Sequence, residues 1–386
     1  MLKGIKVLDF SRYLPGPFAG QRLADMGAEV VKIESPGSGD PARSLGEYGG
    51  LLFRATNRNK KSVTLNLKEP EGQQLAIRLA SRADVLIESF RPGIAGALGI
   101  GYAALKQENP GLVYCSLTGF GQSGPLSSLG SHDLNYLALS GVLAQLKDPS
   151  GRPVQPSFQF ADMIGGIAAV EGILAALVQR SITGAGAYVD FAMTDTLIGM
   201  MTVHALIYNV TGTGQGVAEL TGSTVSYRIY ETAEGRYVSL GALEKKFWEN
   251  FCRAVGREEW IPAHNSPADA ANPIFVALSS LFKSKTLAEW TKFSSEVDCC
   301  MAPVLETGEM TRSPYVEARR LAVETRTRDG EPLRQIFTAA GGMKPEGAGA
   351  ESGEAPGLGR YSREILATWL GASPDQLEDW QERGIV

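Results

Sequence analysis

The sequence predicts an α/β protein in which a parallel sheet with helices on both faces is followed by a smaller α+β domain. Strand-like and helix-like runs alternate through the first half of the chain, which is typical of βαβ units. The pattern changes after about residue 215. At 386 residues the chain is also too long for one ordinary domain, so two domains with a sizeable core are expected.

The first half of the chain supplies the elements of the predicted parallel sheet. The expected strands are Lys6–Asp9, Glu29–Ile33, Ser62–Leu67, Asp84–Glu88 and Leu112–Ser116. The expected helices between them are Pro17–Met26, Glu71–Arg82 and Gly93–Gln107. The very apolar run Met163–Arg180 predicts a helix that is buried on most sides, and Tyr188–Phe191 predicts a late strand.

The second half predicts a hairpin and then helices. Ser226–Thr232 and Arg236–Leu240 flank a turn with a glycine, which indicates two antiparallel strands. The helical patterns that follow are Lys245–Val255, Ala268–Lys283 and Leu287–Ser295. Residues 339–359 are rich in Gly, Pro, Ala and Glu and predict a linker, and Ser362–Val386 predicts helices that pack back on the first domain. We therefore expect a large domain over 1–215, a small domain over 225–325, and the linker with its return over 326–386.

Composition and charge narrow the class of protein. A hydrophobic content of 44% and a charged content of 20% fit a soluble globular enzyme, and the net charge of −5 argues against nucleic acid or an anionic membrane as a partner. The apolar run Ile164–Val178 is shorter than a membrane span and contains Glu171. The first ten residues read as a strand and not as a signal peptide. The four cysteines show no metal-binding spacing: Cys115, Cys252, Cys299 and Cys300. We expect a cytoplasmic protein without a metal.

The run Gly119-Phe120-Gly121-Gln122-Ser123-Gly124 matches the dinucleotide-binding fingerprint, but its context does not fit. That fingerprint needs a helix that begins within the glycines, so that the pyrophosphate lies at the helix N-terminus. Here residues 125–130 read as a loop, and the run follows the fifth predicted strand and not the first. We therefore expect no nicotinamide or flavin site.

A histidine and an aspartate each open a predicted helix, at His132 and at Asp162. An imidazole that faces a carboxylate across a small pocket is a two-base acid–base device. The alternative is helix capping, with Ser131 as the N-cap and Asp133 beside it in the first turn. Capping accounts well for Asp133 and Asp162 and poorly for His132, so the segment predicts a site for proton transfer.

A group of cations follows in the same half of the chain. Within eight residues lie Arg54, Arg58, Lys60 and Lys61, with Lys68 beyond the next strand. Two interpretations stay open on the residues alone, a solvated surface face or a cradle for phosphates in an otherwise acidic protein.

Several ordered motifs resemble those of the family III CoA-transferases, and within that superfamily they are most similar to the α-methylacyl-CoA racemases. They are Leu14–Phe18, Leu23–Glu34, Glu88–Gly93, Leu117–Tyr136, Ala302–Val304 and Pro356–Gly359, spread over nearly the whole chain. The resemblance implies a Rossmann-like large domain, a small domain, and a homodimer whose two chains interlock. It also implies that coenzyme A binds along the strand ends of the large domain.

The resemblance assigns the predicted binding residues. It makes the cation group the phosphate cradle of coenzyme A, together with Arg91, the segment from Leu65 to Lys68, and residues 131–136 with Tyr136 among them. No cofactor beyond the CoA part of the substrate is implied. Ser35 stands where the racemases carry an arginine, which leaves one phosphate contact open, and Arg360-Tyr361 replaces the family's Glu-His after Gly359.

Two activities of this superfamily place an essential aspartate at Asp162. In a transferase it is the covalent nucleophile, and in a racemase it is one of two bases at the α-carbon of an acyl-CoA. The His132–Tyr136 string resembles the racemase signature, and Glu244 stands where the transferases have a glycine-rich loop. We therefore predict epimerisation of a 2-methylacyl-CoA, or a related 2-substituted acyl-CoA, with His132, Asp162, Asp133 and Glu244 in the catalytic site. The alternatives are a CoA-transferase and an acyl-CoA-binding protein without activity. For Glu244 itself, a bond to His132 and an ordinary helix-start position stay open.

Overall fold

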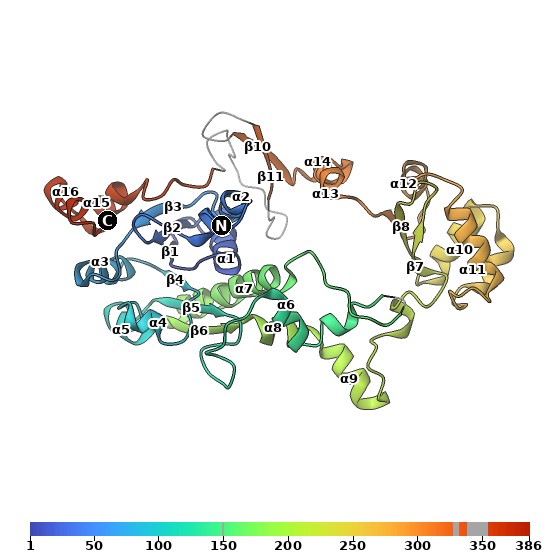
Figure 1. Ribbon diagram of the computed structural model, residues 1–386, viewed down its shortest axis with the longest axis horizontal. Coiled ribbons are helices and arrows are strands. Elements are labelled where there is room, and N and C mark those ends of the chain that lie inside the picture. Colours follow the sequence, from blue (N-terminus) through green and yellow to red (C-terminus); the bar gives the residue numbers. More distant parts are fainter. Residues whose placement is uncertain (149, 327–331, 338–353) are drawn as a thin grey trace. The chain divides into compact units, whose positions relative to one another are not determined.

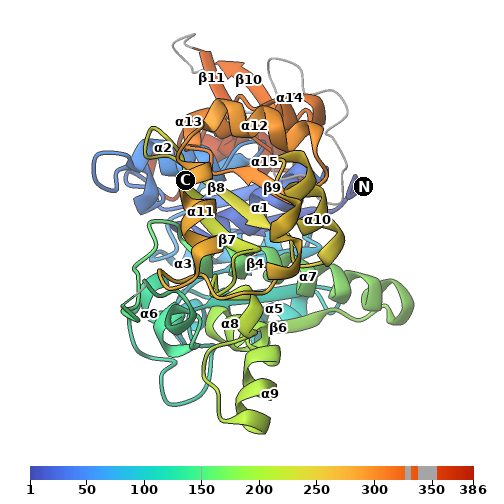
Figure 2. The ribbon, with the colours of Figure 1, turned by 90° about the vertical axis from the view of Figure 1, so that its right-hand side faces the viewer.

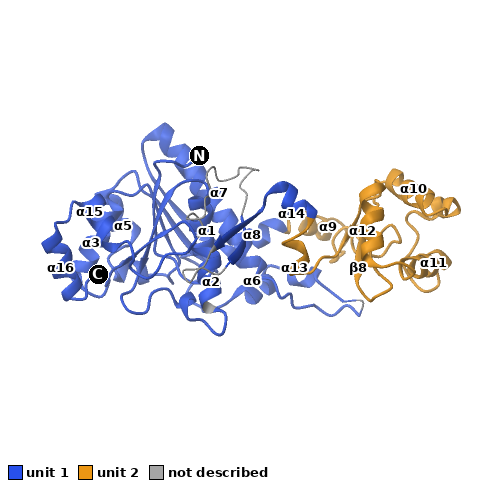
Figure 3. Cartoon of the chain, turned by 90° about the horizontal axis from the view of Figure 1, so that it is seen from above, with its two compact units in different colours: residues 1–200, 314–386 blue, residues 201–313 orange. Residues whose placement is uncertain are grey.

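A computed structural model gives the fold of the chain, and it describes residues 1–148, 150–326, 332–337 and 354–386. The chain forms two compact units (Figure 3). Unit 1 contains residues 1–200 and 314–386, and unit 2 contains residues 201–313. Most of the predicted linker, residues 339–359, lies outside the described residues.

Unit 1 is built on a parallel sheet of six strands (Figure 1). The strands are β1 (Lys6–Asp9), β2 (Glu29–Glu34), β3 (Lys61–Thr64), β4 (Val85–Glu88), β5 (Val113–Thr118) and β6 (Ala187–Ala192). They lie in the order β3-β2-β1-β4-β5-β6, and each neighbouring pair is parallel. The predicted α/β class with a parallel sheet is confirmed. Strands β2 and β3 extend the sheet on one side of β1, and strands β4, β5 and β6 extend it on the other. Open α/β sheets bind their ligands at such a switch in strand order, which here lies between β1 and β4.

Helices cover both faces of this sheet. Those before the second unit are α1 (Pro15–Asp25), α2 (Gly49–Thr56), α3 (Pro70–Ala80), α4 (Ile94–Ala97), α5 (Tyr102–Glu108), α6 (Asp133–Leu139), α7 (Phe160–Thr183) and α8 (Met193–Met200), with 3-10 turns η1 (Pro41–Arg43) and η2 (Leu143–Gln145). One core joins α3, α5 and the C-terminal helices to one face of the sheet. A second core joins α1, α6 and α7 to the other face.

The chain returns to unit 1 after residue 313. It forms α14 (Pro314–Arg319), the antiparallel pair β10 (Ala322–Arg326) and β11 (Pro332–Ile336), then α15 (Ser362–Leu370) and α16 (Pro374–Glu382). The C-terminal helices pack on the α3 side of the sheet, where Trp380 Nε1 donates to Glu71 Oε1 at 2.7 Å.

Helix α7 is the longest helix of the described chain, with 24 residues. By length and composition alone this helix could cross a membrane, which is weak evidence when one helix of the described chain does so. In the structure it packs closely on α1. A Cβ at Gly166 would lie 2.8 Å from the carbonyl oxygen of Pro15, so glycine allows the starts of the two helices to approach.

Unit 2 is an α+β unit (Figure 2). Its elements are α9 (Thr202–Thr211), η3 (Ala218–Leu220), β7 (Tyr227–Glu231), β8 (Tyr237–Gly241), α10 (Lys245–Ala254), η4 (Glu258–Ala263), α11 (Pro273–Phe282), α12 (Leu287–Glu296), β9 (Met301–Pro303) and α13 (Thr307–Met310). The predicted hairpin is confirmed as β7 and β8, and β9 adds a third antiparallel strand. The helix predicted to begin at Ala268 begins at Pro273, because the Asn272 side chain caps it by accepting from the N–H of Ile274.

Candidate active site

Two helix starts of unit 1 meet at the residues predicted for proton transfer. The N–H of Asp162, in the first turn of α7, donates to Oδ1 of Asp133 at 3.1 Å. Asp133 is the first residue of α6, and His132 precedes it as the N-cap. The structure thus brings His132, Asp133 and the start of α7 into one place, although the sequence separates them.

The N-cap of α6 differs from the prediction. The sequence favoured Ser131, but His132 occupies the cap position with extended backbone, and its N–H donates to Asn135 Oδ1 at 3.0 Å. The Ser131 Oγ is buried and has no hydrogen-bond partner among the described residues. The imidazole of His132 is exposed, so its ring is accessible to a substrate.

The carboxyl group of Asp162 is poised for proton exchange at neutral pH. Burial, and secondarily the neighbouring charge of Asp133, raises the pKa of Asp162 from 3.8 to about 7. Both protonation states are therefore populated near pH 7, which is the condition that favours general acid–base catalysis. Asp133 thus has two effects: it positions the backbone of Asp162 and raises its basicity.

Asp162→Asn is expected to stabilise the folded protein at high pH. The folded state holds the Asp162 proton more tightly than the unfolded chain, because the pKa is raised, so the wild type loses stability as the pH rises from 3.8 through about 7. The asparagine side chain has no carboxyl group to titrate, so the variant does not lose stability in this way as the pH rises. Urea denaturation should show the variant gaining about 2–3 kcal/mol on the wild type between pH 5 and pH 8.

The control for this pH effect is Glu171→Gln, on an exposed position of the same helix. Its free energy of unfolding should keep a constant difference from the wild type over the same pH range. A constant difference for Asp162→Asn as well would show that the carboxyl of Asp162 has an ordinary pKa.

Tyr136 and the glycine run fix the shape of the α6 start. Tyr136 is buried, and its hydroxyl donates to the carbonyl oxygen of Ser131 at 2.9 Å. A Cβ at Gly119 would lie 2.3 Å from the Tyr136 ring, and the N–H and Oγ1 of Thr194 both donate to the Gly119 carbonyl. No described helix begins within the glycines, so Gly119 is explained by close packing against Tyr136.

The structure corrects the expectation that the predicted cations form one continuous cradle. Arg58 is 2% exposed, pairs with Asp25 at 2.5 Å, and donates to the carbonyl oxygen of Ile336. Lys60 is also buried and pairs with Asp9 at 2.7 Å. Both charges are neutralised inside the protein, so neither faces a ligand in the described chain.

The other predicted binding residues differ in exposure. Lys61 pairs with Glu29 at 3.0 Å and with Glu364 at 2.8 Å. Leu65 is a core residue, 1% exposed. Three cations are at least partly exposed and have no carboxylate partner among the described residues: Arg54, Lys68 and Arg91. Of these, Arg91 lies beside the α6 start, because a Cβ at Gly130 would be 2.6 Å from its Nη2.

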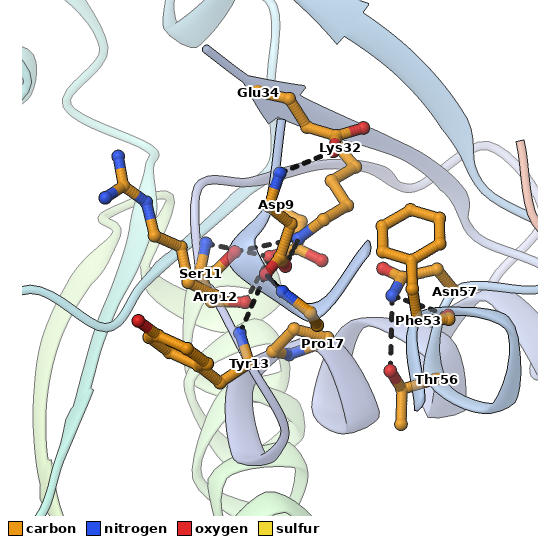
Figure 4. Close-up of polar contacts among 12 residues, drawn as sticks. Asp9, Ser11, Arg12, Tyr13, Pro17, Lys32, Glu34, Phe53, Thr56 and Asn57 are labelled. Atoms are coloured by element: carbon orange, nitrogen blue, oxygen red, sulfur yellow. Dashed lines mark hydrogen bonds and ion pairs between the residues drawn. The ribbon is translucent and has the colours of Figure 1, made fainter. Parts of the chain in front are cut away.

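A buried ion network, which sequence reasoning missed, lies at the carboxyl ends of β1 and β2 (Figure 4). Lys60 Nζ donates to Asp9 Oδ2 at 2.7 Å, to the Pro17 carbonyl at 2.8 Å and to Asn57 Oδ1 at 2.9 Å. Burial outweighs the attraction of Asp9 and lowers the pKa of Lys60 to about 8. Burial alone would raise the pKa of Asp9, but the charges of Lys32 and Lys60 lower it below its usual value.

The second half of this network reaches the loop between β1 and α1. Lys32, opposite Asp9 in the sheet, pairs with Asp40 at 2.9 Å and donates to the Ser11 carbonyl at 2.8 Å. Asp40 Oδ1 in turn accepts from the N–H of Tyr13 at 3.1 Å. The network therefore ties the loop that follows β1 to Lys32 of β2 and to Asp40.

Lys60→Met is expected to destabilise the protein by about 3–5 kcal/mol, because it leaves the Asp9 charge buried without its partner. The double variant Asp9→Asn/Lys60→Met should recover part of this loss in urea denaturation. Lys61→Met is the matched control: the Lys61 side chain is 33% exposed, so its loss should cost about 0–1 kcal/mol. Equal losses at the two lysines would contradict the network.

Glu244 lies in unit 2, where it is the exposed N-cap residue of α10. This placement fits an ordinary helix-start acid. The hydrogen bond between Glu244 and His132 stays a prediction.

Comparisons with known proteins agree with the motifs. The chain matches the family model CoA-transferase family III over residues 2–361. It is 34% identical over 338 residues to the alpha-methylacyl-CoA racemase of Homo sapiens, covering 86% of this chain and 85% of that protein. It is 35% identical over 336 residues to the succinyl-CoA:glutarate CoA-transferase of Homo sapiens, covering 84% and 76%. A crystal structure of a CAIB/BAIF family protein from Brucella suis matches with a TM-score of 0.80 at 28% identity, covering 95% of this chain and 99% of that one. The chain therefore belongs to CoA-transferase family III, as its motifs predicted, and is an enzyme of that family.

Proposed function

We propose that this enzyme epimerises a 2-methylacyl-CoA, or a related 2-substituted acyl-CoA, at the α-carbon. The observation that carries the proposal is the meeting of two helix starts, one bearing His132 and the other Asp162 with a pKa of about 7. A racemase needs two groups that exchange roles as acid and base, and these residues have the chemistry for it.

In each turnover the α-carbon loses one proton to one base and gains one proton from the other. Neutral His132 removes the α-proton of one epimer, which leaves an enolate of the thioester. Protonated Asp162 then delivers its proton to the opposite face of the same carbon. The reaction leaves an imidazolium and a carboxylate, and the opposite epimer reacts from this state with the roles reversed. Exchange of both protons with solvent returns the enzyme to its starting state.

The enolate oxygen requires stabilisation as its charge develops. Backbone N–H groups at the start of α6 supply donors, and the helix N-terminus favours negative charge. The approach of α7 to the same place adds a second positive helix end. The negative charge of Asp133 partly cancels the positive ends of the two helices. We propose that Asp133 acts mainly on Asp162, by accepting a hydrogen bond from its N–H and by raising its pKa.

The alternative function is transfer of CoA between carboxylic acids, with Asp162 as a covalent nucleophile. Relatives with either activity are about equally similar to this chain, so similarity does not distinguish the two. The raised pKa of Asp162 suits the racemase, because a carboxyl group that is partly protonated near neutral pH can deliver a proton as well as remove one. Retention of His132 and of Glu244 favours it as well.

We further propose that Arg54, Lys68 and Arg91 bind phosphates of the CoA part. Arg91 has the strongest support, since it lies beside the α6 start. An interlocked homodimer, a cytoplasmic location, and the lack of any metal, nucleic-acid or membrane partner complete the proposal. They rest on family resemblance, on cysteine usage and on charge.

The deciding experiment is incubation of the enzyme with one epimer of a 2-methylacyl-CoA in deuterated water. We expect deuterium at the α-carbon together with formation of the other epimer, followed by mass spectrometry and chiral chromatography. Transfer of CoA to an added carboxylic acid, without α-deuterium in the acyl-CoA, would instead support the transferase.

A further inference from the structure

An asparagine in the first turn of α6 is hydrogen-bonded to the backbone of His132. Oδ1 of Asn135 accepts from the N–H of His132 at 3.0 Å, and the N–H of Asn135 donates to the His132 carbonyl at 2.8 Å. A backbone N–H can only donate, so the side-chain atom that faces it is the oxygen, and the amide nitrogen takes the other position. The orientation of the Asn135 amide beside His132 is therefore fixed.

The amide nitrogen of Asn135 has no acceptor in the described part of the chain. Asn135 is exposed, and no described residue accepts a hydrogen bond from its Nδ2. Asp133, in the same turn, offers only acceptors when it is ionised, and its Oδ1 accepts from the N–H of Asp162 at 3.1 Å. Asn135 thus presents unused N–H donors in the turn of helix that joins His132 to the start of α7.

Helix capping uses only the oxygen of this amide. At the start of α12, the carboxylate of Glu289 does the same work and accepts from the N–H of Thr286 at 2.7 Å. At the start of α13, the carboxylate of Glu309 accepts from the N–H of Glu306 at 2.7 Å. An acidic side chain therefore caps a helix of this chain without any donor. Capping explains the oxygen of Asn135 and leaves its N–H groups without a role.

The proposed epimerisation creates a need for such donors. At the enolate stage His132 and Asp162 both carry a proton, but each directs that proton at one face of the α-carbon. The enolate oxygen lies in the plane between the two faces, so its negative charge requires donors that neither base supplies. An amide does not titrate, so its N–H groups stay available over the whole pH range in which the two bases act.

We propose that Asn135 is a catalytic residue, whose Nδ2–H donates to the thioester oxygen of the bound acyl-CoA and stabilises the enolate. This inference rests on the proposed epimerisation. The hydrogen bond strengthens as negative charge develops, so it lowers the barrier more than it tightens substrate binding. No proton leaves the amide. Both epimers pass through the same enolate, so Asn135 serves both directions of the reaction equally.

Asn135→Asp tests the donor, because aspartate keeps an oxygen for the N–H of His132 and has no N–H group of its own. We expect kcat for epimerisation to fall by about 10²–10³, with KM changed by less than about threefold. α-Proton exchange of each pure epimer in deuterated water should fall by the same factor, while the melting temperature stays near that of the wild type. Asn135→Gln, which keeps both an oxygen and N–H groups, should recover at least about tenfold of the lost rate.

Leu134→Asp is the control for the charge that Asn135→Asp adds. It places a carboxylate on the neighbouring position of α6, where Leu134 is 38% exposed, and leaves Asn135 in place. Water and salt screen an exposed charge, so the rate of this variant should fall by less than about tenfold.

Each other outcome overturns the inference in a recognisable way. An unchanged kcat in Asn135→Asp would leave Asn135 as a helix cap alone. A loss confined to the epimer that His132 serves, identified with His132→Ala, would show that Asn135 only positions His132. An equal loss in Leu134→Asp would assign the effect to charge. These three results would leave the proposed function intact, whereas a wild type that incorporates no α-deuterium would overturn the proposed function, and this inference with it.

Discussion

Asp162→Ala is expected to abolish epimerisation while leaving α-proton exchange in one epimer only. Each of the two bases serves one face of the α-carbon, so His132 can still remove and return the proton on its own face. Loss of a positioned acid–base group commonly lowers the rate by about 10²–10⁴. The measurement is α-deuterium incorporation into each pure epimer in deuterated water, together with the rate of conversion between the epimers.

Two controls accompany this variant. Asp162→Asn keeps the size of the side chain and removes its proton chemistry, so its epimerisation defect should match that of alanine. Glu171→Gln, exposed on the same helix, should retain the wild-type rate.

A covalent mechanism makes a different prediction for the wild type. A transferase forms an activated acyl ester on Asp162, which hydroxylamine converts to a hydroxamate that mass spectrometry detects. Such an adduct on Asp162, with no α-deuterium in any 2-methylacyl-CoA, would replace the racemase with the transferase.

The sheet and the positions of the acid–base residues follow from local sequence. Alternating strand and helix patterns predicted the parallel strands, and His132 and Asp162 were placed correctly near helix starts. Both kinds of signal lie within about ten residues, which is the range over which periodicity and capping act. The three-residue strand β9 was missed because Met301–Pro303 is too short to show a period.

Contacts between residues far apart in the sequence were not predicted, because periodicity and capping act only over short stretches of the chain. Lys60 and Asp9 are 51 positions apart, and no local pattern distinguishes Lys60, which is buried, from Lys61, which is partly exposed. A run of cations therefore reads as one surface, although Arg54 lies in α2, Lys60 lies in the loop before β3, and Lys61 lies in β3 itself. The link between Asp133 and Asp162, 29 positions apart, was likewise visible only once the two helix starts had met.

His132→Ala should separate the two mechanisms most sharply, because only the racemase needs this side chain. We expect epimerisation to fall by about 10²–10⁴, with α-proton exchange kept in the epimer that Asp162 serves and lost in the other. This is the mirror image of the result for Asp162→Ala, and the two variants together assign one base to each face. The measurement is the same exchange experiment on pure epimers.

Helix capping supplies the competing explanation for His132, and a third variant tests it. His132→Asn retains a good N-cap for α6, but an asparagine side chain cannot act as a general base. If His132 acts as a base, His132→Asn should be as inactive as alanine while its melting temperature stays near that of the wild type. Restored epimerisation in His132→Asn would show that the residue only starts the helix. A transferase would lose little activity in either variant, because Asp162 alone carries its covalent chemistry.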